Sequence, residues 1–176
     1  GVNIGMVQRY YPALNIIEAL PSSDNWPGRV NGVLVAAMGT AVVNDQIYAY
    51  GGWETNSAPY FSAETWRFDP CAPSGSRWTN LGMPLGLARS YFLSAVQDGK
   101  IYAIGGIYDY PGQADLVPTA QVEMLDTANL AAGWQLRAPM PVALAEGRGY
   151  GFDSDTLAPV PGYTYTAGGG DWPLPS

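Results

Sequence analysis

Several short sequence motifs recur along the chain at a nearly constant interval, and this repeat constrains the fold more than any other feature. Glycine pairs follow short apolar runs at Gly51-Gly52, Gly105-Gly106 and Gly168-Gly169. Trp78 recurs as Trp134, at almost the same interval as the first two glycine pairs. Independent marks that share one period indicate an internal repeat, in which each unit is one supersecondary motif.

Two further marks keep a similar period. Met83-Pro84 recurs as Met140-Pro141. Three arginines are also nearly evenly spaced, namely Arg29, Arg89 and Arg148.

Each unit is expected to contain four short strands. Residues 41–43 and 93–96 are apolar runs that enter turns rich in Asn, Asp and Gly, which accept a positive φ. A second strand ends at the glycine pair, where a side chain is excluded. A third strand is predicted at 63–69 and 119–126, and a fourth carries the repeated Trp, which we expect in the core between blades. Four strands in about 50 residues are typical of one blade of a β-propeller.

This arrangement resembles the kelch repeat, in which an apolar strand ends in Gly-Gly and is followed by an aromatic-Asp-Pro step, a Trp, Met-Pro and Arg. Residues 40–89 carry every mark, including Phe68-Asp69-Pro70, whereas residues 91–148 have Leu125-Asp126 in place of the aromatic step. The N-terminal region resembles the second half of an earlier repeat, with Ile17 in the Trp position, and the C-terminal region resembles the first half of a later one. The resemblance implies an all-β chain, a kelch-type β-propeller segment of two full four-stranded blades plus two half blades.

The repeat divides the chain into four parts. Residues 1–37 are a half blade (third and fourth strands) with a linker, 38–89 and 90–147 are kelch blades, and 148–176 are a half blade with first and second strands. A closed propeller needs at least four blades. Three explanations are open. The chain is a fragment of a longer six- or seven-bladed protein, or it pairs with a second copy to close a six-bladed ring, or the missing blades lie in partner subunits or in disordered chain.

Composition excludes several classes of function. The net charge is −7, Lys100 is the only lysine and the arginines are scattered, which argues against nucleic-acid binding and against basic membrane-surface binding. The chain has no histidine and a single cysteine, Cys71, so it offers no Ser-His-Asp or Cys-His site, no zinc site and no intrachain disulfide. We predict no cofactor and no metal. Apolar runs all fall short of about 18 residues, so we predict no membrane insertion.

The loops that follow the glycine pairs are the predicted binding surface. Long aromatic loops on a rigid sheet scaffold are where recognition is usually built. The candidate ligand-binding residues there are Trp53, Tyr60, Tyr108, Asp109, Tyr110 and Trp172. These side chains either stack on sugar rings or anchor a protein partner, or they pack over the blade edges.

The repeated arginines are a second set of candidates. They precede the first strand of each blade, which the kelch resemblance places nearest the central channel. Arg29, Arg89 and Arg148 either line a polar pocket there or fix adjacent blades by pairing with backbone carbonyls and acids. The loops also carry the carboxylates Asp109, Asp115 and Asp171. No fixed spacing among these carboxylates supports glycoside hydrolysis or calcium binding.

These observations predict a non-catalytic propeller module that binds a protein or a carbohydrate. The scarcity of lysine and the abundance of Tyr, Trp, Gly and Pro favour an extracellular or cell-surface location. One alternative is the propeller portion of a glycan-active enzyme or a sugar epimerase, as some kelch proteins are. Another is a structural subunit of a larger assembly.

Overall fold

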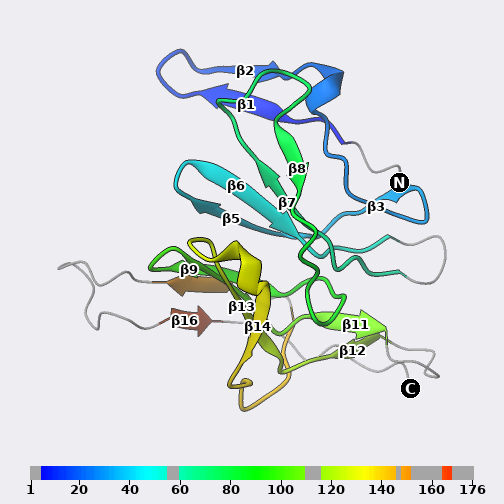
Figure 1. Ribbon diagram of the computed structural model, residues 1–176. Coiled ribbons are helices and arrows are strands. Elements are labelled where there is room, and N and C mark those ends of the chain that lie inside the picture. The colour runs from blue at the N-terminus through cyan, green and yellow to red at the C-terminus, as the bar shows by residue number, and fades with distance from the viewer. Residues whose placement is uncertain (1–4, 55–59, 110–115, 146–147, 152–163, 168–176) are drawn as a thin grey trace.

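The computed structural model describes residues 5–54, 60–109, 116–145, 148–151 and 164–167, the last two ranges by their backbone alone. Antiparallel sheets dominate this part of the chain, together with two short 3-10 helices, Ser22–Asp24 (η1) and Leu130–Ala132 (η2) (Figure 1). None of the helices in the described ranges is long and apolar enough to cross a membrane.

Two four-stranded sheets form the centre of the structure. The first blade consists, in spatial order, of β5 (Gly39–Val43), β6 (Gln46–Tyr50), β7 (Thr65–Phe68) and β8 (Trp78–Asn80). The second blade repeats this order with β9 (Leu93–Gln97), β10 (Lys100–Ile104), β13 (Val122–Asp126) and β14 (Trp134–Arg137). The prediction of an all-β propeller segment built from four-stranded blades is confirmed.

The turns within the blades have the chemistry that the sequence predicts. Asn44 and Asp45 join β5 to β6 with φ of 50° and 59°. Asp98 and Gly99 join β9 to β10 with φ of 49° and 70°. Two consecutive residues with positive φ match the right-handed twist of a hairpin, and Asn, Asp and Gly tolerate this conformation best.

A two-stranded hairpin lies at each end of the pair of blades. The N-terminal hairpin joins β1 (Gln8–Tyr11) to β2 (Ile16–Ala19), and the C-terminal hairpin joins β15 (Arg148–Gly151) to β16 (Thr164–Ala167). In the N-terminal hairpin Tyr10 lies opposite Ile17, as Phe68 lies opposite Trp78 in the first blade. The hairpin therefore has the register of third and fourth strands. The boundaries of the four parts stay a prediction.

Two smaller hairpins complete the described fold. One joins β3 (Arg29–Val30) to β4 (Val33–Leu34) ahead of the first blade. The other joins β11 (Ile107–Asp109) to β12 (Leu116–Pro118) and extends from the second blade after its glycine pair.

The glycine pair of the first blade is the point where the second blade is attached. Gly51 and Gly52 have φ of 64° and 106°, and the Gly52 N–H donates to the Arg89 carbonyl at 3.0 Å. A Cβ on Gly51 would lie 2.6 Å from that carbonyl oxygen. The same bond recurs one unit later, where the Gly106 N–H donates to the Leu144 carbonyl at 2.9 Å. Glycine is required because neither the backbone angle nor the space admits a side chain.

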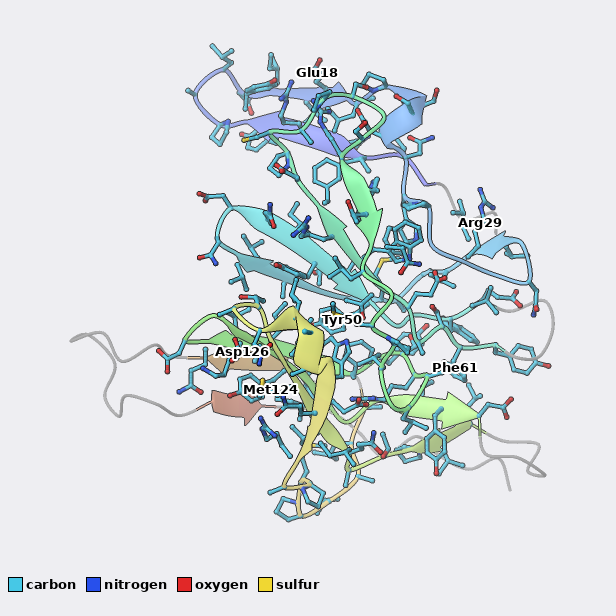
Figure 2. All side chains as sticks on the ribbon, in the orientation of Figure 1. Glu18, Arg29, Tyr50, Phe61, Met124 and Asp126 are labelled. Atoms are coloured by element: carbon cyan, nitrogen blue, oxygen red, sulfur yellow. The ribbon has the colours of Figure 1, made fainter. Side chains whose placement is uncertain are left out.

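The core lies between the two blades. Tyr50 is fully buried, stacks on Phe92 at 5.4 Å and meets the ring of Trp134 at 4.9 Å (Figure 2). Burial raises the pKa of the Tyr50 hydroxyl, which pairs with Ser94 of the next blade. Trp134 Nε1 donates to the Thr65 hydroxyl of the preceding blade at 2.8 Å. Trp134 is thus an inter-blade core residue, as expected.

The N-terminal segment is attached to the first blade through a buried acid. The Asp24 carboxylate accepts hydrogen bonds from the Gly75 N–H at 2.7 Å and the Ser74 hydroxyl at 2.9 Å, and it pairs with Arg77 at 2.9 Å. Trp78 Nε1 donates to the Asp24 carbonyl at 2.9 Å. The backbone bond from Gly75, with help from Ser74 and Arg77, lowers the pKa of Asp24.

Replacing Gly51 by Ala should destabilise the fold more than the same change at Gly82. Both glycines have nearly the same φ, 64° and 65°, but a Cβ on Gly82 meets nothing within 4 Å. The loss of unfolding free energy in Gly82→Ala therefore measures the cost of the left-handed backbone alone, about 1–2 kcal/mol. We expect Gly51→Ala to cost about 2 kcal/mol more in urea unfolding, because the Arg89 carbonyl must move. Equal costs would show that the inter-blade contact does not limit stability.

Lowering the pH should weaken attachment of the N-terminal segment. The folded pKa of Asp24 lies below its ordinary value of 3.8, so its stabilising effect is complete above that value and is lost as pH falls through the folded pKa. Hydrogen exchange of the Gly75 amide should accelerate, relative to core amides, below pH 3.8. In Asp24→Asn the Gly75 amide should exchange fast, relative to core amides, at all pH values. If the relative exchange of the wild-type Gly75 amide did not change with pH, the role given to the Asp24 carboxylate would be contradicted.

Candidate functional site

The segments that leave the two glycine pairs begin with the same backbone pairing. Trp53 forms a bridge with Ala36, and Ile107 forms the corresponding bridge with Ser90. Both bonds of each bridge are made, at 2.9 Å in the first blade and at 2.9 and 3.0 Å in the second. The segments that begin at Trp53 and Ile107 therefore leave their neighbouring blades at the same end of the structure.

An apolar cluster forms where these segments meet. Trp53 stacks on Phe61 at 6.3 Å and meets the Tyr91 ring at 5.8 Å. Phe61 and Ile107 are buried, whereas the remaining large members are half-buried: Trp53, Tyr60, Tyr91 and Leu116. Figure 2 shows Phe61 beside β11, away from Tyr50 in the inter-blade core. We call this set of six side chains the loop-face cluster.

Tyr91 of the loop-face cluster has an unusual backbone conformation. Its φ is 52°, in the left-handed region that aromatic residues rarely adopt. Ala37, at the equivalent position before the first blade, has a φ of 49°. Its carbonyl accepts a bond from the buried Ser90 hydroxyl at 2.8 Å. Non-glycine residues in this conformation concentrate at binding and catalytic sites, where surrounding structure holds them.

The structure brings some of the sequence-predicted residues together. Trp53 and Tyr60 belong to the loop-face cluster. Tyr108 and Asp109 are half-buried on β11, directly after Ile107. The other loop candidates lie outside the described residues: Tyr110, Asp115, Asp171 and Trp172.

Sequence reasoning missed three residues of this region. The sequence indicates Tyr91 only as the first residue of a repeat, because a positive φ at an aromatic residue leaves no sign in the sequence. Phe61 and the buried Glu54 lie in the predicted loop but were not singled out. The Glu54 N–H donates to the Tyr60 carbonyl at 2.8 Å, a contact that the sequence gives no sign of.

Metal binding finds no support in this part of the chain. Among the described residues, no three His, Cys, Asp or Glu side chains lie close enough to hold an ion.

A profile of the kelch motif matches residues 88–129, which run from the approach to β9 to the residue before η2. A solved structure titled "Structure of YjhT", a kelch-type propeller, superposes with a TM-score of 0.60 at 20% identity over 84% of this chain. The described part of the chain has the fold of part of a kelch-type β-propeller. The chain spans about half of that solved chain, since the match covers 47% of it. Comparison with curated protein sequences gave no match.

The three spaced arginines do not occupy equivalent places in the kelch units. The bond that Gly52 makes to the Arg89 carbonyl is made by Gly106 to Leu144, so Leu144 is the counterpart of Arg89. Arg148 of β15 lies opposite Ala167 of β16, as Gly39 of β5 lies opposite Tyr50 of β6. Arg148 is therefore the counterpart of Gly39, the first residue of a first strand, and not of Arg89. The expectation of a recurring arginine is therefore wrong, because the step from one arginine to the next is longer than the step between the first two glycine pairs.

Arg89 is buried and fully engaged by its own blade. Its guanidinium forms an ion pair with the buried Glu123 and donates to the carbonyls of Gly105, Ala103 and Leu87 at 2.9, 3.1 and 3.0 Å. Glu123 also accepts from the Gly86 N–H at 2.6 Å. These bonds fasten the segment that approaches β9 to its own blade, so Arg89 pairs with backbone carbonyls and an acid within one blade and not across two.

Arg29 is exposed in the small β3–β4 hairpin and donates to the Gly32 carbonyl of that hairpin at 2.8 Å. Arg148 is the first residue of β15, where the structure describes only the backbone. Neither arginine contributes a described contact to the loop-face cluster.

Removing one partner of the buried pair should be strongly destabilising. Arg89→Met leaves the Glu123 carboxylate buried without its cation, and we expect a loss of about 3–5 kcal/mol in urea unfolding. The double change Arg89→Met with Glu123→Leu should recover part of that loss, since both charges are gone. Glu18→Gln, in the exposed Arg9–Glu18 pair, is the control and should change little. A single variant as stable as the wild type would rule out the scaffold role.

Proposed function

We propose that the chain is a non-catalytic kelch propeller module that binds a carbohydrate or protein ligand through the loop-face cluster. The observation that carries this proposal is the half-buried Trp53, fixed between Phe61 and Tyr91 at the end of two neighbouring blades. Large aromatic side chains that remain partly accessible on a rigid scaffold are the side chains that dominate binding energy in recognition sites.

Two properties of the cluster favour a binding role over simple packing. Trp53 and Tyr91 are positioned in the free protein by backbone bridges and by the left-handed backbone at Tyr91. A side chain that is already ordered loses little conformational entropy when a ligand arrives, which increases affinity. The half-buried Tyr108 and Asp109 on β11 follow the cluster residue Ile107 and supply polar groups at its edge, where hydrogen bonds to a ligand confer specificity.

The proposal places the protein at the cell surface or outside the cell. This placement rests on composition, with one lysine and many Tyr, Trp, Gly and Pro residues. Of the three loop carboxylates only Asp109 lies in the described ranges, so the enzyme alternative stays a prediction.

Replacing Trp53 by Ala should reduce ligand affinity at least about tenfold, because truncation of a central aromatic residue typically removes about 2 kcal/mol or more. The probes are an array of neutral and acidic oligosaccharides and a phage-displayed peptide library, each screened first on the wild-type chain. Affinities of the selected probes are then measured for both proteins by calorimetry.

Trp66→Phe is the matched control. Trp66 is also half-buried, but it lies on β7 against Trp26 at 6.1 Å, away from the loop-face cluster. Melting curves followed by circular dichroism establish that both variants are folded. Full binding by Trp53→Ala, or equal losses for the two variants, would refute the proposed site.

A further inference from the structure

A cleft of about 220 Å³ lies at the outer corner of the first blade, where β7 begins and β8 ends. Its lining consists of Glu64, Thr65, Asn80, Gly82, Met83 and Pro84. Thr65 is fully buried, whereas Glu64 is half-buried and Asn80 is exposed. The cleft therefore offers a carboxylate and an amide on one side and the apolar side chains of Met83 and Pro84 on the other.

The Glu64 carboxylate is oriented by two neutral donors. Trp66 Nε1 donates to one of its oxygens at 2.9 Å, and Asn80 Nδ2 donates to the other at 3.4 Å. Asn80 is itself held, because its side-chain oxygen accepts from the Gly82 N–H at 2.9 Å. None of the ion pairs in the described part of the chain includes Glu64. The carboxylate therefore has open acceptor positions and no cation beside it, since an ionised carboxylate accepts about four hydrogen bonds.

The blade fold does not require a carboxylate at this corner. In the second blade Gln121 holds the position of Glu64, because its carbonyl accepts the same bond from the glycine pair. Leu136 holds the position of Asn80 in the strand register. The second blade thus forms the same sheet with neither the acid nor the amide that borders it. A ligand accounts for the carboxylate of the first blade better than the scaffold does.

A neighbouring blade leaves this corner accessible. Trp134 of the second blade faces the first blade and packs on Tyr50. Leu136 is the next residue on that face of β14, because alternate residues of a strand share a face, and yet it is 68% exposed. The space between neighbouring blades is therefore open at the end of the fourth strand. The equivalent corner of the first blade holds Glu64 and Asn80.

We propose that this cleft binds a primary ammonium group on an aliphatic stem, as in a lysine side chain or a small alkylamine. An ammonium has three donors and no acceptor, which matches a site whose open positions are on carboxylate and amide oxygens. Met83 and Pro84 cover the methylene groups of the stem, as apolar surfaces do for long cationic side chains. The site lies apart from the side chains of the loop-face cluster and does not depend on the function proposed for that cluster.

Other cations fit the cleft less well. Calcium and magnesium need six or more oxygen ligands, whereas here the groups nearest the carboxylate are the N–H donors of Trp66 and Asn80. A guanidinium forms its paired bonds with both oxygens of a carboxylate in one plane. Each Glu64 oxygen already accepts one bond, so a compact ammonium is the better match.

An NMR titration of the isotope-labelled chain with butylammonium chloride tests the site. The reporter is the indole N–H resonance of Trp66, which donates to Glu64 and is assigned by its loss in Trp66→Phe. We expect a saturable shift of this resonance with butylammonium and none with n-butanol, which has the same stem without the charge. No saturable shift, or the same shift with both compounds, would overturn the proposal.

Glu64→Gln should raise the dissociation constant for butylammonium at least about tenfold, because hydrogen bonds to charged groups contribute this much. The glutamine oxygen can still accept from Trp66, so the fold and the reporter are kept. Glu18→Gln is the matched control, since it removes the same charge from the exposed Arg9–Glu18 pair and should leave binding unchanged. Equal losses in the two variants would show attraction by net charge alone and would refute the site.

Asn80→Lys tests the site with the carboxylate kept. The new ammonium stands beside Glu64 on the adjacent strand and should weaken butylammonium binding at least about tenfold by occupying the cleft. Unchanged binding by this variant would contradict the proposal.

A lysine peptide distinguishes the two sources of the ammonium. The probe is Gly-Lys-Gly blocked at both ends, compared with the same peptide acetylated on the lysine side chain. Tighter binding than butylammonium assigns the cleft to a protein lysine, and weaker binding assigns it to a small amine. Equal binding of the acetylated peptide would rule out recognition of the ammonium. Trp53→Ala should bind butylammonium as the wild type does, which separates this site from the loop-face cluster.

Discussion

The backbone contact between the glycine pair of one blade and the approach segment of the next is the interaction on which the rest of the structure depends. The Gly52 N–H reaches the Arg89 carbonyl, and Gly106 reaches Leu144 in the same way. Because no side chain fits at Gly51, the second blade sits directly on the end of the first. The close approach brings Phe92 onto Tyr50 and allows Trp134 to reach across to Thr65.

The candidate binding site follows from the same contact. Trp53 and Ile107 come directly after the two glycine pairs, so the spacing of the blades determines the spacing of the loops. Arg89 and Glu123 fasten the segment that leads to Tyr91, and Tyr91 in turn contacts Trp53. The buried Arg89–Glu123 ion pair therefore helps to position the aromatic side chains of the loop-face cluster.

The N-terminal hairpin is less covered by neighbouring structure than the two full blades are. Each full blade is covered on one side by its neighbour, whereas the N-terminal hairpin leaves Leu14 and Ile17 in solvent. Repeat units that cannot bury their own faces need a neighbour or a cap.

From the sequence alone, the repeat determined the fold class and the four strands of each blade. It also determined the turns at Asn44-Asp45 and Asp98-Gly99 and the inter-blade position of Trp134. Each of these features depends on local spacing and residue type. It also predicted Trp53 and Tyr60 as binding residues, and the structure places both in the loop-face cluster. Tertiary structure alone decided that Arg89 has no equivalent at Arg29 or Arg148, because equivalence depends on which carbonyl each glycine pair reaches. It alone placed Tyr91 beside Trp53, since a left-handed backbone at an aromatic residue is imposed by contacts distant in the chain.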